Sequence, residues 1–390
     1  MNRAAQRVSR LAPTIFTEFT LLAQKAGAVN LGQGFPDFDG PEEVKQAAIE
    51  AIRAGTNQYA AGPGAPGLRR AIAAHADRFY GQQLDPETMI SVTSGATEAL
   101  FDAIVGLVDP GDEVVMFEPF YDSYLASIEI AGGVARPVRL QPPDAAHANF
   151  WFDVEELREA FSPKTKLMLL NTPHNPTGKV FTRAELEQIA AICEEHDAVV
   201  VTDEVYEHLV YAPAKHLRFA TLPGMAERTL SISSAGKTFA LTGWKIGWAM
   251  GPRELRSAMQ SVHQYVTFAT SAPMQAAIAQ ALALPDVFFS ELAKDYARRR
   301  DLLLNALKAA GLITLPTEGA YFVLAESRLP SDFEFCRYLT ETVGVAAIPI
   351  SAFYSAGHAH LAKPLARFAF CKKDETLAEA ARRLLKLSTS

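Results

Sequence analysis

Residues 167–206 read LMLLNTPHNPTGKVFTRAELEQIAAICEEHDAVVVTDEVY, and this stretch indicates the fold more clearly than any other part of the chain. It begins with the apolar run Leu167–Leu170 and contains a second one, Ala198–Thr202. Between them, residues Thr182–His196 have the spacing of an amphipathic helix. Continuous apolar strands separated by a helix are typical of a parallel sheet that is covered on both faces. The stretch therefore predicts a strand–helix–strand unit.

The same alternation extends on both sides of this unit. Further apolar runs occur at Ile90–Val92, Val114–Phe117, Thr229–Ile232 and Ile246–Met250. Helical patterns lie at Pro41–Ala54, Thr97–Val108 and Asp153–Phe161. We therefore expect an α/β fold with a mostly parallel sheet and covering helices over residues 41–285.

A second, smaller domain is expected because 390 residues exceed the usual size of one hydrophobic core. The long helical pattern Val287–Ala310 ends at Gly311 and would lead into it. Its elements would be Leu315–Ala325, a helix Ser331–Val343, Arg367–Cys371 and a last helix Glu375–Leu387. We expect residues 1–40 to form an N-terminal arm and part of the small domain, 41–285 the large domain, and 286–390 the small C-terminal domain.

Composition and charge exclude several classes of protein. Hydrophobic residues make up 49% and charged residues 21%, and the net charge is 37 − 44 = −7. Without a run of basic residues, we expect no nucleic-acid surface. The three cysteines are widely spaced, which suits neither a disulfide framework nor a cysteine zinc site. With no secretory signal and no 18-residue apolar run, we expect a cytoplasmic protein without a membrane partner.

Polar residues follow the predicted strands repeatedly. They are Thr93-Ser94-Gly95, Glu118-Pro119, Asn171-Thr172-Pro173, Asp203-Glu204 and Ser233-Ser234. In open parallel sheets, ligands bind at the carboxyl ends of the strands. The clustering of polar groups at this one edge predicts an enzyme.

Two glycine-containing stretches match nucleotide-binding motifs only superficially. Gly62–Gly67 fits the dinucleotide pattern GxGxxG, but no apolar strand precedes it and two prolines interrupt it. Gly236-Lys237-Thr238 resembles the end of a P-loop, but the required first glycine would be residue 231, which is Ser231. We read the first stretch as a Gly/Pro loop and reject a nucleotide site in the second.

Lys237 is left without a role by these motifs. A lone lysine after a strand is usually a solvated loop residue. Here small residues precede Lys237 and Phe239, Ala240 and Leu241 follow, which favours a partly buried pocket. Burial lowers the pKa of a lysine, so that a neutral amine becomes available for covalent chemistry with a carbonyl group.

Three motifs around Lys237 resemble a known family. Ser234-Ala-Gly-Lys-Thr-Phe-Ala-Leu-Thr-Gly-Trp-Lys-Ile-Gly247 is similar to the cofactor-lysine signature of class I/II aminotransferases, which are fold type I pyridoxal-phosphate enzymes. Asn171–Gly178 and Thr202–Tyr206 resemble the other two family motifs, in the family's order. Leu31–Asp37, Asn57–Tyr59 and Arg367–Phe370 extend the resemblance along nearly the whole chain. It is closest to the branch of methionine, kynurenine and glutamine aminotransferases, and implies a seven-stranded large domain.

The resemblance implies roles for four residues at the cofactor ring. Lys237 would hold the cofactor aldehyde covalently and then act as a general base. Asp203 would face the ring nitrogen, although an aspartate that ends a buried strand is often only a helix cap. Tyr206 and Asn175 would donate to the ring oxygen, although Asn175-Pro-Thr-Gly178 in isolation is simply a turn.

The resemblance also implies a phosphate site and a stacking aromatic. Ser94–Thr97 leads into a helix whose first amides suit an anion. The implied cofactor contacts are Gly95, Ala96, Thr97, Ser234, Lys245, and Tyr59 from the other subunit of a homodimer. Tyr121 matches the aromatic residue that stacks on the ring, with Phe120 as an alternative and a core aromatic as the simpler reading.

For the substrate, Arg367 matches the family's carboxylate-binding arginine, and its planar fork suits bidentate recognition. Gly34 and Asn175 are further substrate contacts by resemblance, and Phe16 and Phe268 are candidates for an apolar side-chain pocket. His358 and His360 lie in a polar loop without a third ligand nearby, so we expect no metal site.

These residues predict an aminotransferase with ping-pong half-reactions between an amino acid and a 2-oxo acid. A β-lyase acting on cysteine S-conjugates is the alternative on the same scaffold, because function depends on the site rather than the fold. A PLP-binding regulator is disfavoured because such proteins usually add a DNA-binding module, and the arm before Gly32 has neither the length nor the basic charge expected for one. The segment His263–Thr270, expected from the partner subunit, has no arginine or lysine, with His263 and Thr97 as possible polar contacts. We therefore expect methionine, glutamine, aromatic amino acids and kynurenine rather than aspartate.

Overall fold

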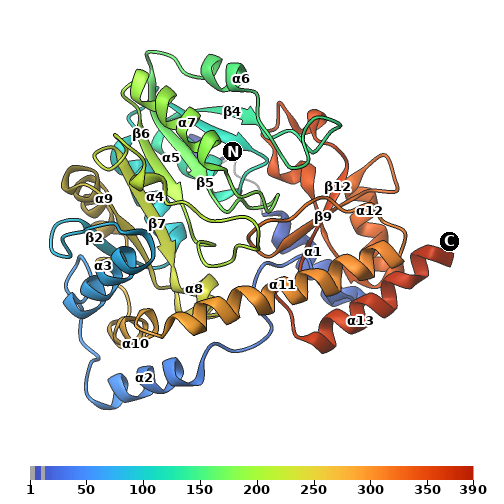
Figure 1. The fold of residues 1–390 in the computed structure, drawn as a ribbon, viewed down its shortest axis with the longest axis horizontal. Coiled ribbons are helices and arrows are strands. Elements are labelled where there is room, and N and C mark those ends of the chain that lie inside the picture. Colours follow the sequence, from blue (N-terminus) through green and yellow to red (C-terminus); the bar gives the residue numbers. More distant parts are fainter. Residues whose placement is uncertain (1–4, 10–13, 390) are drawn as a thin grey trace.

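A central seven-stranded sheet organises the computed structural model, which describes residues 5–9 and 14–389 (Figure 1). Its strands are β2 (Ile90–Thr93), β3 (Glu113–Glu118), β4 (Val134–Arg139), β5 (Thr165–Asn171), β6 (Val199–Asp203), β7 (Thr229–Ser234) and β8 (Gly247–Met250). They lie in the order β2-β8-β7-β6-β5-β3-β4. The pairs from β7 to β4 are parallel, and β8 runs antiparallel to both of its neighbours. The predicted α/β fold with a mostly parallel sheet is confirmed.

Strand β5 shows why the central apolar runs are continuous. Leu167 and Leu169 belong to one buried hydrophobic cluster, while Met168 and Leu170 belong to another. Because successive side chains of a strand point to opposite faces, a strand covered on both faces needs apolar residues at every position. The run therefore reflects a core on each side of the sheet.

Helices cover both faces of this sheet (Figure 1). They are α3 (Pro66–Tyr80), α4 (Ala96–Leu107), α5 (Ser123–Ala131), α6 (Val154–Glu159), α7 (Arg183–Glu195), α9 (Arg253–Val266) and α10 (Ala272–Leu282), while α2 (Glu42–Arg53) packs on α10. Helix α7 begins with a capping box, in which Thr182 and Glu185 satisfy each other's backbone amides. The helix between the two apolar runs of residues 167–206 therefore begins where the sequence predicts.

The C-terminal elements form a second, smaller sheet. Helix α11 (Asp286–Ala309) leads to an antiparallel sheet of β9 (Phe322–Glu326), β12 (Leu365–Ala369) and β11 (Ile348–Pro349), which we call the C-terminal sheet. Helices α12 (Asp332–Tyr338) and α13 (Asp374–Leu384) flank it, and a π-helical turn, Leu339–Val343, follows α12.

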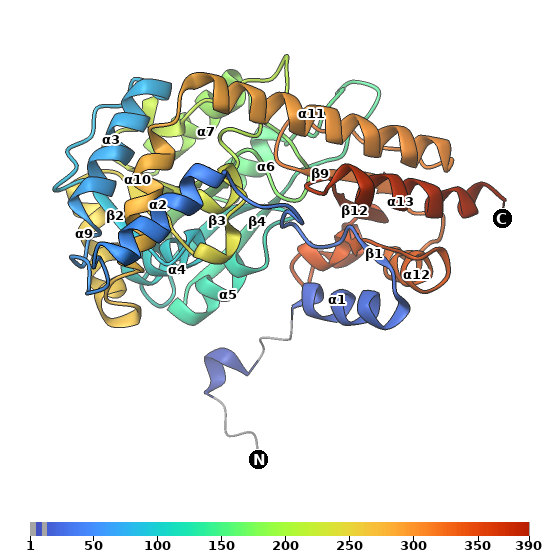
Figure 2. The same cartoon turned by 90° about the horizontal axis from the view of Figure 1, so that it is seen from below.

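The N-terminal elements join this second part rather than the central sheet. Helix α1 (Ile15–Ala26) lies beside the C-terminal elements, and β1 (Val29–Asn30) pairs in parallel with β10 (Val345–Ala346) (Figure 2). The chain then crosses to α2, so residues 31–41 run between the two sheets. The domain limits given above stay a prediction.

Among the described residues, no single helix has the length and apolar composition needed to cross a membrane, whereas the bent pair α10 and α11 meets those criteria together.

Candidate active site

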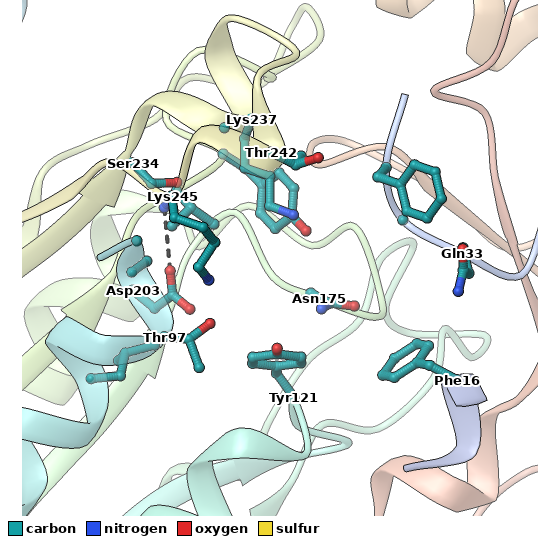
Figure 3. A pocket seen from close by; sticks show the side chains of 18 of the residues that line it. Phe16, Gln33, Thr97, Tyr121, Asn175, Asp203, Ser234, Lys237, Thr242 and Lys245 are labelled. Carbon is teal, nitrogen blue, oxygen red and sulfur yellow. Dashed lines mark hydrogen bonds between the residues drawn. The ribbon is translucent and has the colours of Figure 1, made fainter. Parts of the chain in front are cut away.

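A cavity of about 290 Å³ lies where the central sheet meets the C-terminal sheet. The carboxyl ends of β2, β6 and β7 supply one side, and residues 33–35, Phe322 and Arg367 supply the other. Figure 3 shows Thr97, Ser234 and Lys245 gathered at one end and Phe16 and Gln33 at the opposite end. Of the residues predicted at this edge, Gly95, Asp203 and Ser234 line the cavity. Glu118 bonds Ser355, and Glu204 bonds Arg218, both away from it.

Lys237 lies in this cavity on the short helix α8 (Ala235–Thr238), directly after β7. Its Nζ donates to the hydroxyl of Tyr321 at 2.9 Å. Burial lowers the pKa of Lys237 to about 8, with Asp203 and Cys371 opposing the shift. The sequence-based expectation of a buried lysine in a pocket is confirmed, and a neutral amine is accessible near neutral pH.

Asp203 ends β6 and faces the same cavity. Its Oδ2 accepts from the hydroxyl of Tyr124 at 2.6 Å, and its Oδ1 accepts from the amide of Val205 at 3.3 Å. Burial raises the pKa of Asp203, and these two donors counteract that shift only in part. A cationic N–H group placed against this carboxylate would lower its pKa and favour the ionised form.

The far end of the cavity is built for an anion. Gly95 precedes α4 with a φ of 81°, and a Cβ atom there would lie 3.0 Å from Nζ of Lys245. The absence of a side chain therefore leaves the first amides of α4 open beside the Lys245 ammonium group. Ala96, Thr97 and Ser234 line the same end.

Arg367 lies on β12 and is 1% exposed. Its Nη1 donates to Oδ1 of Asn175 at 2.8 Å and its Nη2 to the carbonyl of Gly32 at 2.9 Å. Its Nε is buried without a hydrogen-bond partner among the described residues. Burial lowers the pKa of Arg367 to about 10. A carboxylate ligand would both satisfy Nε and relieve the cost of this buried charge.

Aromatic rings make up much of the remaining wall. Phe322 lies with its centroid 4.0 Å from the Arg367 guanidinium carbon, and Phe16 lies at 5.1 Å. Tyr121 and Tyr206 also line the cavity, and burial raises the pKa of both hydroxyls. Phe120, the alternative to Tyr121, is instead buried in the core. Of the two aromatics weighed for stacking, only Tyr121 is within reach.

Two predicted site residues lie outside this cavity. Tyr59 is 85% exposed and Phe268 is 50% exposed, and their rings touch edge to face at 5.3 Å. Both residues are expected to act across a subunit interface, so their roles at the site stay predictions. The proposal that His263 contacts the substrate is wrong, because His263 is fully buried against Glu98 and the Gly62 carbonyl.

Sequence reasoning missed several residues of the site. Tyr321 bonds Lys237, Tyr124 bonds Asp203, and Gln33, Thr242 and Phe322 line the cavity. Tyr124 follows Tyr121 by three residues, and that spacing is the one signal in the sequence that places the two on the same face of a helical turn. Tyr321 offers no local signal, because its partners are 84 and 287 residues away in the chain.

Comparison with known proteins gives consistent matches along almost the whole chain. Residues 26–384 match the family model of aminotransferase class I and II. The chain is 48% identical to a probable N-succinyldiaminopimelate aminotransferase of Mycobacterium tuberculosis, over 97% of both chains. It is 42% identical to a kynurenine–oxoglutarate transaminase of Dictyostelium discoideum, covering 99% of this chain and 96% of that one. It is 41% identical to a methionine aminotransferase of Escherichia coli, over 98% and 97%.

Solved structures agree with these matches. The structure of the Mycobacterium tuberculosis N-succinyldiaminopimelate aminotransferase superposes with a TM-score of 0.94, covering 98% of this chain and all of that one. A structure from Escherichia coli whose authors identify a methionine aminotransferase function superposes with a TM-score of 0.93, covering 99% and 100%. The similarity therefore includes the central sheet, the C-terminal sheet and the cavity between them.

Proposed function

This chain belongs to the class I and II aminotransferases, which are pyridoxal-phosphate enzymes, and we propose that its amino donor is an apolar, thioether or aromatic L-amino acid. The amino group would pass to a 2-oxo acid in two ping-pong half-reactions. The observation that carries the proposal is the cavity itself. It sets Lys237, Asp203 and Arg367 against a wall of aromatic rings, with no second arginine among the residues that line it.

The residues of the cavity fit pyridoxal phosphate. Lys237, Lys245 and Arg367 face a single carboxylate, Asp203, so the cavity suits a ligand with negative charge. The opening at Gly95 suits a phosphate group, and the carboxylate of Asp203 suits a cationic ring nitrogen. When bound, pyridoxal phosphate withdraws electrons from the amino carbon of the substrate and so makes its proton acidic.

The roles we propose for the residues follow from their positions. The neutral amine of Lys237 holds the cofactor covalently and, once released, moves the proton at the substrate's amino carbon. Asp203 holds the cationic N–H of the ring, and Tyr124 keeps its carboxylate in place. The amides of α4, Ser234 and Lys245 hold the phosphate, while Tyr206 and Asn175 reach the ring oxygen.

Arg367 would bind the carboxylate of the substrate next to its reacting carbon. The stacked ring of Phe322 and the bond to Asn175 fix the plane of the guanidinium before the substrate arrives. A preorganised fork loses little entropy on binding. The backbone of Gly34 lines the cavity beside it and is a second candidate contact for the same carboxylate.

The nature of the wall supports the choice of donor. Phe16, Tyr121 and Phe322 offer apolar surface, and each methylene buried there contributes ~0.8 kcal/mol. A second carboxylate without a partner would cost several kcal/mol. The 48% identity to a protein named for N-succinyldiaminopimelate, a substrate with further carboxylates, makes that compound a second candidate donor.

A single-turnover experiment tests the proposal. The purified holoenzyme is mixed with one amino acid at a time, and the spectral change of the bound cofactor gives rate over affinity. We expect methionine, glutamine, phenylalanine and kynurenine to exceed aspartate. Aspartate or N-succinyldiaminopimelate outrunning methionine would contradict the proposal and imply a cation supplied by another chain. Release of pyruvate from a cysteine S-conjugate, without turnover of methionine, would instead indicate the β-lyase.

We further propose that the active unit is a homodimer with shared sites. Tyr59, Tyr265, Val266 and Phe268 are all at least half exposed on one chain, and exposed apolar patches of this kind mark interfaces. Three buried free cysteines are consistent with the proposed cytoplasmic location.

Hybrid dimers test the sharing of sites. Tyr59→Phe protomers are mixed with Lys237→Ala protomers, each of which is expected to be impaired on its own. If Tyr59 serves the partner's site, each hybrid has one intact site and one with both lesions, so activity is regained on mixing. No recovery, or full activity as a monomer by light scattering, would contradict shared sites.

A further inference from the structure

The hydroxyl of Tyr321 connects the two sides of the cavity. It accepts from Nζ of Lys237 at 2.9 Å and donates to the carbonyl of Gly34 in a short hydrogen bond. Tyr321 is fully buried and comes immediately before β9 of the C-terminal sheet, whereas Lys237 follows the central sheet. One oxygen atom therefore joins three separate parts of the chain.

The direction of each hydrogen bond follows from the chemistry of the groups. A carbonyl oxygen can only accept, so the single proton of the Tyr321 hydroxyl is used by Gly34. The phenol oxygen then offers only lone pairs to Lys237, and the amine must donate.

The segment that receives the Tyr321 proton is itself held by the C-terminal part of the chain. Arg367 donates to the carbonyl of Gly32, Tyr321 to that of Gly34, and Lys372 to that of Phe35 at 2.8 Å. All three donors are at most 3% exposed. A side chain at Gly34 would place its Cβ 2.7 Å from the ring of Phe322, so the close approach requires glycine.

We propose that Tyr321 is a positioning residue for Lys237, an inference that rests on the proposed function of that lysine. By accepting one N–H, the phenol oxygen fixes the amine so that its lone pair points into the cavity rather than toward the C-terminal sheet. Because the same hydroxyl is bonded to Gly34, the lysine is presented correctly only when residues 32–35 are seated under Arg367 and Lys372.

The ring of Tyr321 has little freedom to move away from this position. It packs edge to face on Tyr206 at 5.0 Å and on Phe322 at 4.8 Å, and stacks on Tyr296 at 6.2 Å. The charged or titratable groups that act on Nζ of Lys237 are Asp203, Arg367, Lys245, Cys371, Tyr206 and Tyr321 itself. Removing the Tyr321 oxygen changes one of these groups and leaves the packing in place.

The test uses Tyr321→Phe, with Tyr296→Phe as the matched control. Tyr296 is a buried neighbour in the same aromatic stack, and its hydroxyl has no hydrogen-bond partner among the described residues. In each apoenzyme, competition labelling with acetic anhydride over a range of pH, followed by peptide mass mapping, gives the titration midpoint of Lys237. A hydrogen-bond acceptor stabilises the ammonium form more than the amine, so its loss lowers the midpoint.

We expect the midpoint in Tyr321→Phe to fall by about one pH unit relative to wild type, and that in Tyr296→Phe to stay unchanged. In the holoenzyme, kcat of Tyr321→Phe should fall about ten- to a hundredfold with little change in KM, because a displaced general base slows proton transfer without weakening binding. Equal midpoints in the two variants, or a change confined to KM, would overturn the proposal. If the wild-type protein converted no amino acid, the proposed function would be wrong. The labelling of the apoenzyme would still test the effect of Tyr321 on Lys237.

Discussion

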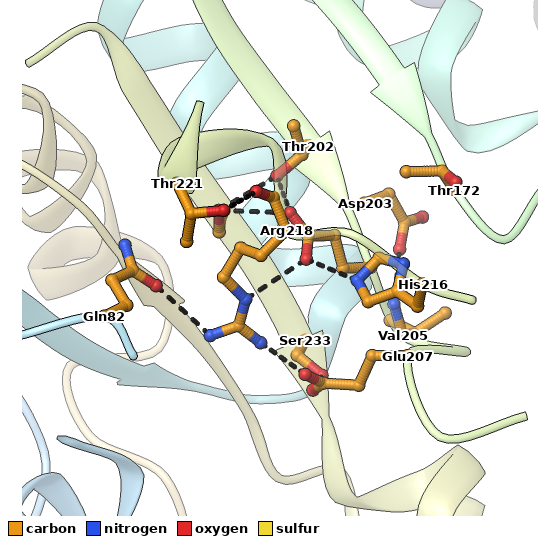
Figure 4. A network of polar contacts seen from close by, with 12 residues as sticks. Gln82, Thr172, Thr202, Asp203, Val205, Glu207, His216, Arg218, Thr221 and Ser233 are labelled. Carbon is orange, nitrogen blue, oxygen red and sulfur yellow. Dashed lines mark hydrogen bonds and ion pairs between the residues drawn. The ribbon is translucent and has the colours of Figure 1, made fainter. Parts of the chain in front are cut away.

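Arg218 and Arg367 are both 1% exposed, and yet their surroundings are opposite. Arg218 donates to Glu204 at 3.2 Å and, in a shorter ion pair, to Glu207 (Figure 4). Its guanidinium group also lies over the ring of Tyr80. Arg367 forms no ion pair with any carboxylate among the described residues and keeps an unused Nε. Although burial disfavours the charge of both, the neighbouring glutamates raise the pKa of Arg218, whereas that of Arg367 is lowered.

The two environments begin at the same short stretch of chain. Asp203 and Tyr206 face the cavity, while Glu204 and Glu207, one position further along, face Arg218. Around Arg218 the remaining acceptors are also used, since His216, Thr202 and Ser233 donate to the two glutamates (Figure 4). Burial alone would raise the pKa of Glu207, but Arg218 together with His208, His75 and the Ser233 hydroxyl outweighs it and lowers that pKa.

This comparison separates a structural network from a binding site. Pairing within the fold offsets the desolvation cost of a buried charge, whereas a buried charge that is left unpaired carries that cost until a ligand pairs with it. The charged groups of the Arg218 network are paired with one another. Around Lys237 and Arg367, charged and hydrogen-bonding groups remain available for a ligand. This difference between the two regions can be measured.

The largest effect on stability is expected from Arg218→Met. The variant leaves Glu204 and Glu207 buried without their cation, which should cost about 3–5 kcal/mol of unfolding free energy. Urea denaturation of the apoenzyme measures it. As a control, Arg298→Met removes an exposed pair with Asp295 and Asp374, and should cost less than about 1 kcal/mol. Equal losses of unfolding free energy in the two variants would contradict the proposed difference between the buried network and an exposed ion pair.

Arg367→Met should affect activity instead. Removing a buried partner of the substrate carboxylate should cost about 2–5 kcal/mol of transition-state stabilisation, which lowers kcat/KM for methionine roughly 30- to 5,000-fold. The loss of stability should be smaller than for Arg218→Met, because an unpaired buried charge is removed along with its contacts to Asn175 and Gly32.

A donor without a carboxylate makes the assignment of Arg367 specific. Wild-type enzyme should strongly prefer methionine to the corresponding amine, 3-(methylthio)propylamine, whereas Arg367→Met should treat the two almost alike. If the preference survived the substitution, another group would bind the carboxylate, and the contrast with Arg218 would lose its functional meaning.

Much of the cavity and of the central sheet could be predicted from the sequence. Arg367, Lys237 and Asp203 each belong to a local sequence motif. The central strands are continuous apolar runs, which can be recognised without knowing which strands pair. Strand β4 was missed because it lies at the edge of the sheet, alternates in burial and contains Pro137. An edge strand tolerates such a pattern, which is weak evidence in a sequence.

The Arg218 network could not be predicted, and the same holds for Tyr321. Gln82 lies 136 residues from Arg218 and Glu204 lies 14 residues from it, and no local pattern in the sequence pairs them. The sequence shows that charged residues are present but not which of them pair. His263 illustrates the limit, because a polar residue expected in the substrate pocket is instead buried and bonded to Glu98 on α4.

The smallest expected effect concerns Asp102, which is a third kind of buried ionisable group. It is fully buried on α4, neither of its oxygens accepts a hydrogen bond from the described residues, and Nδ1 of His263 lies 3.7 Å away. It does not line the cavity, so no ligand can satisfy it there. Burial, helped by Glu98, raises the pKa of Asp102 to about 7, which means that the fold retains a proton on this carboxyl group.

A raised carboxyl pKa makes the fold less stable as pH rises, because between about pH 4 and pH 7 the native state binds a proton that the unfolded chain has released. The pKa of His263 is also raised, by Glu98 and Asp102 against the effect of burial, and its linkage has the same sign. Asp102→Asn removes the first contribution and weakens the second. Relative to wild type, the variant should therefore gain about 2–3 kcal/mol between pH 5 and pH 8. Urea midpoints at the two pH values measure this gain, with the exposed Asp301→Asn as the control. A gain that is the same at both pH values would mean that Asp102 is already ionised in the fold, and that this protein tolerates an unpaired buried charge outside its ligand site.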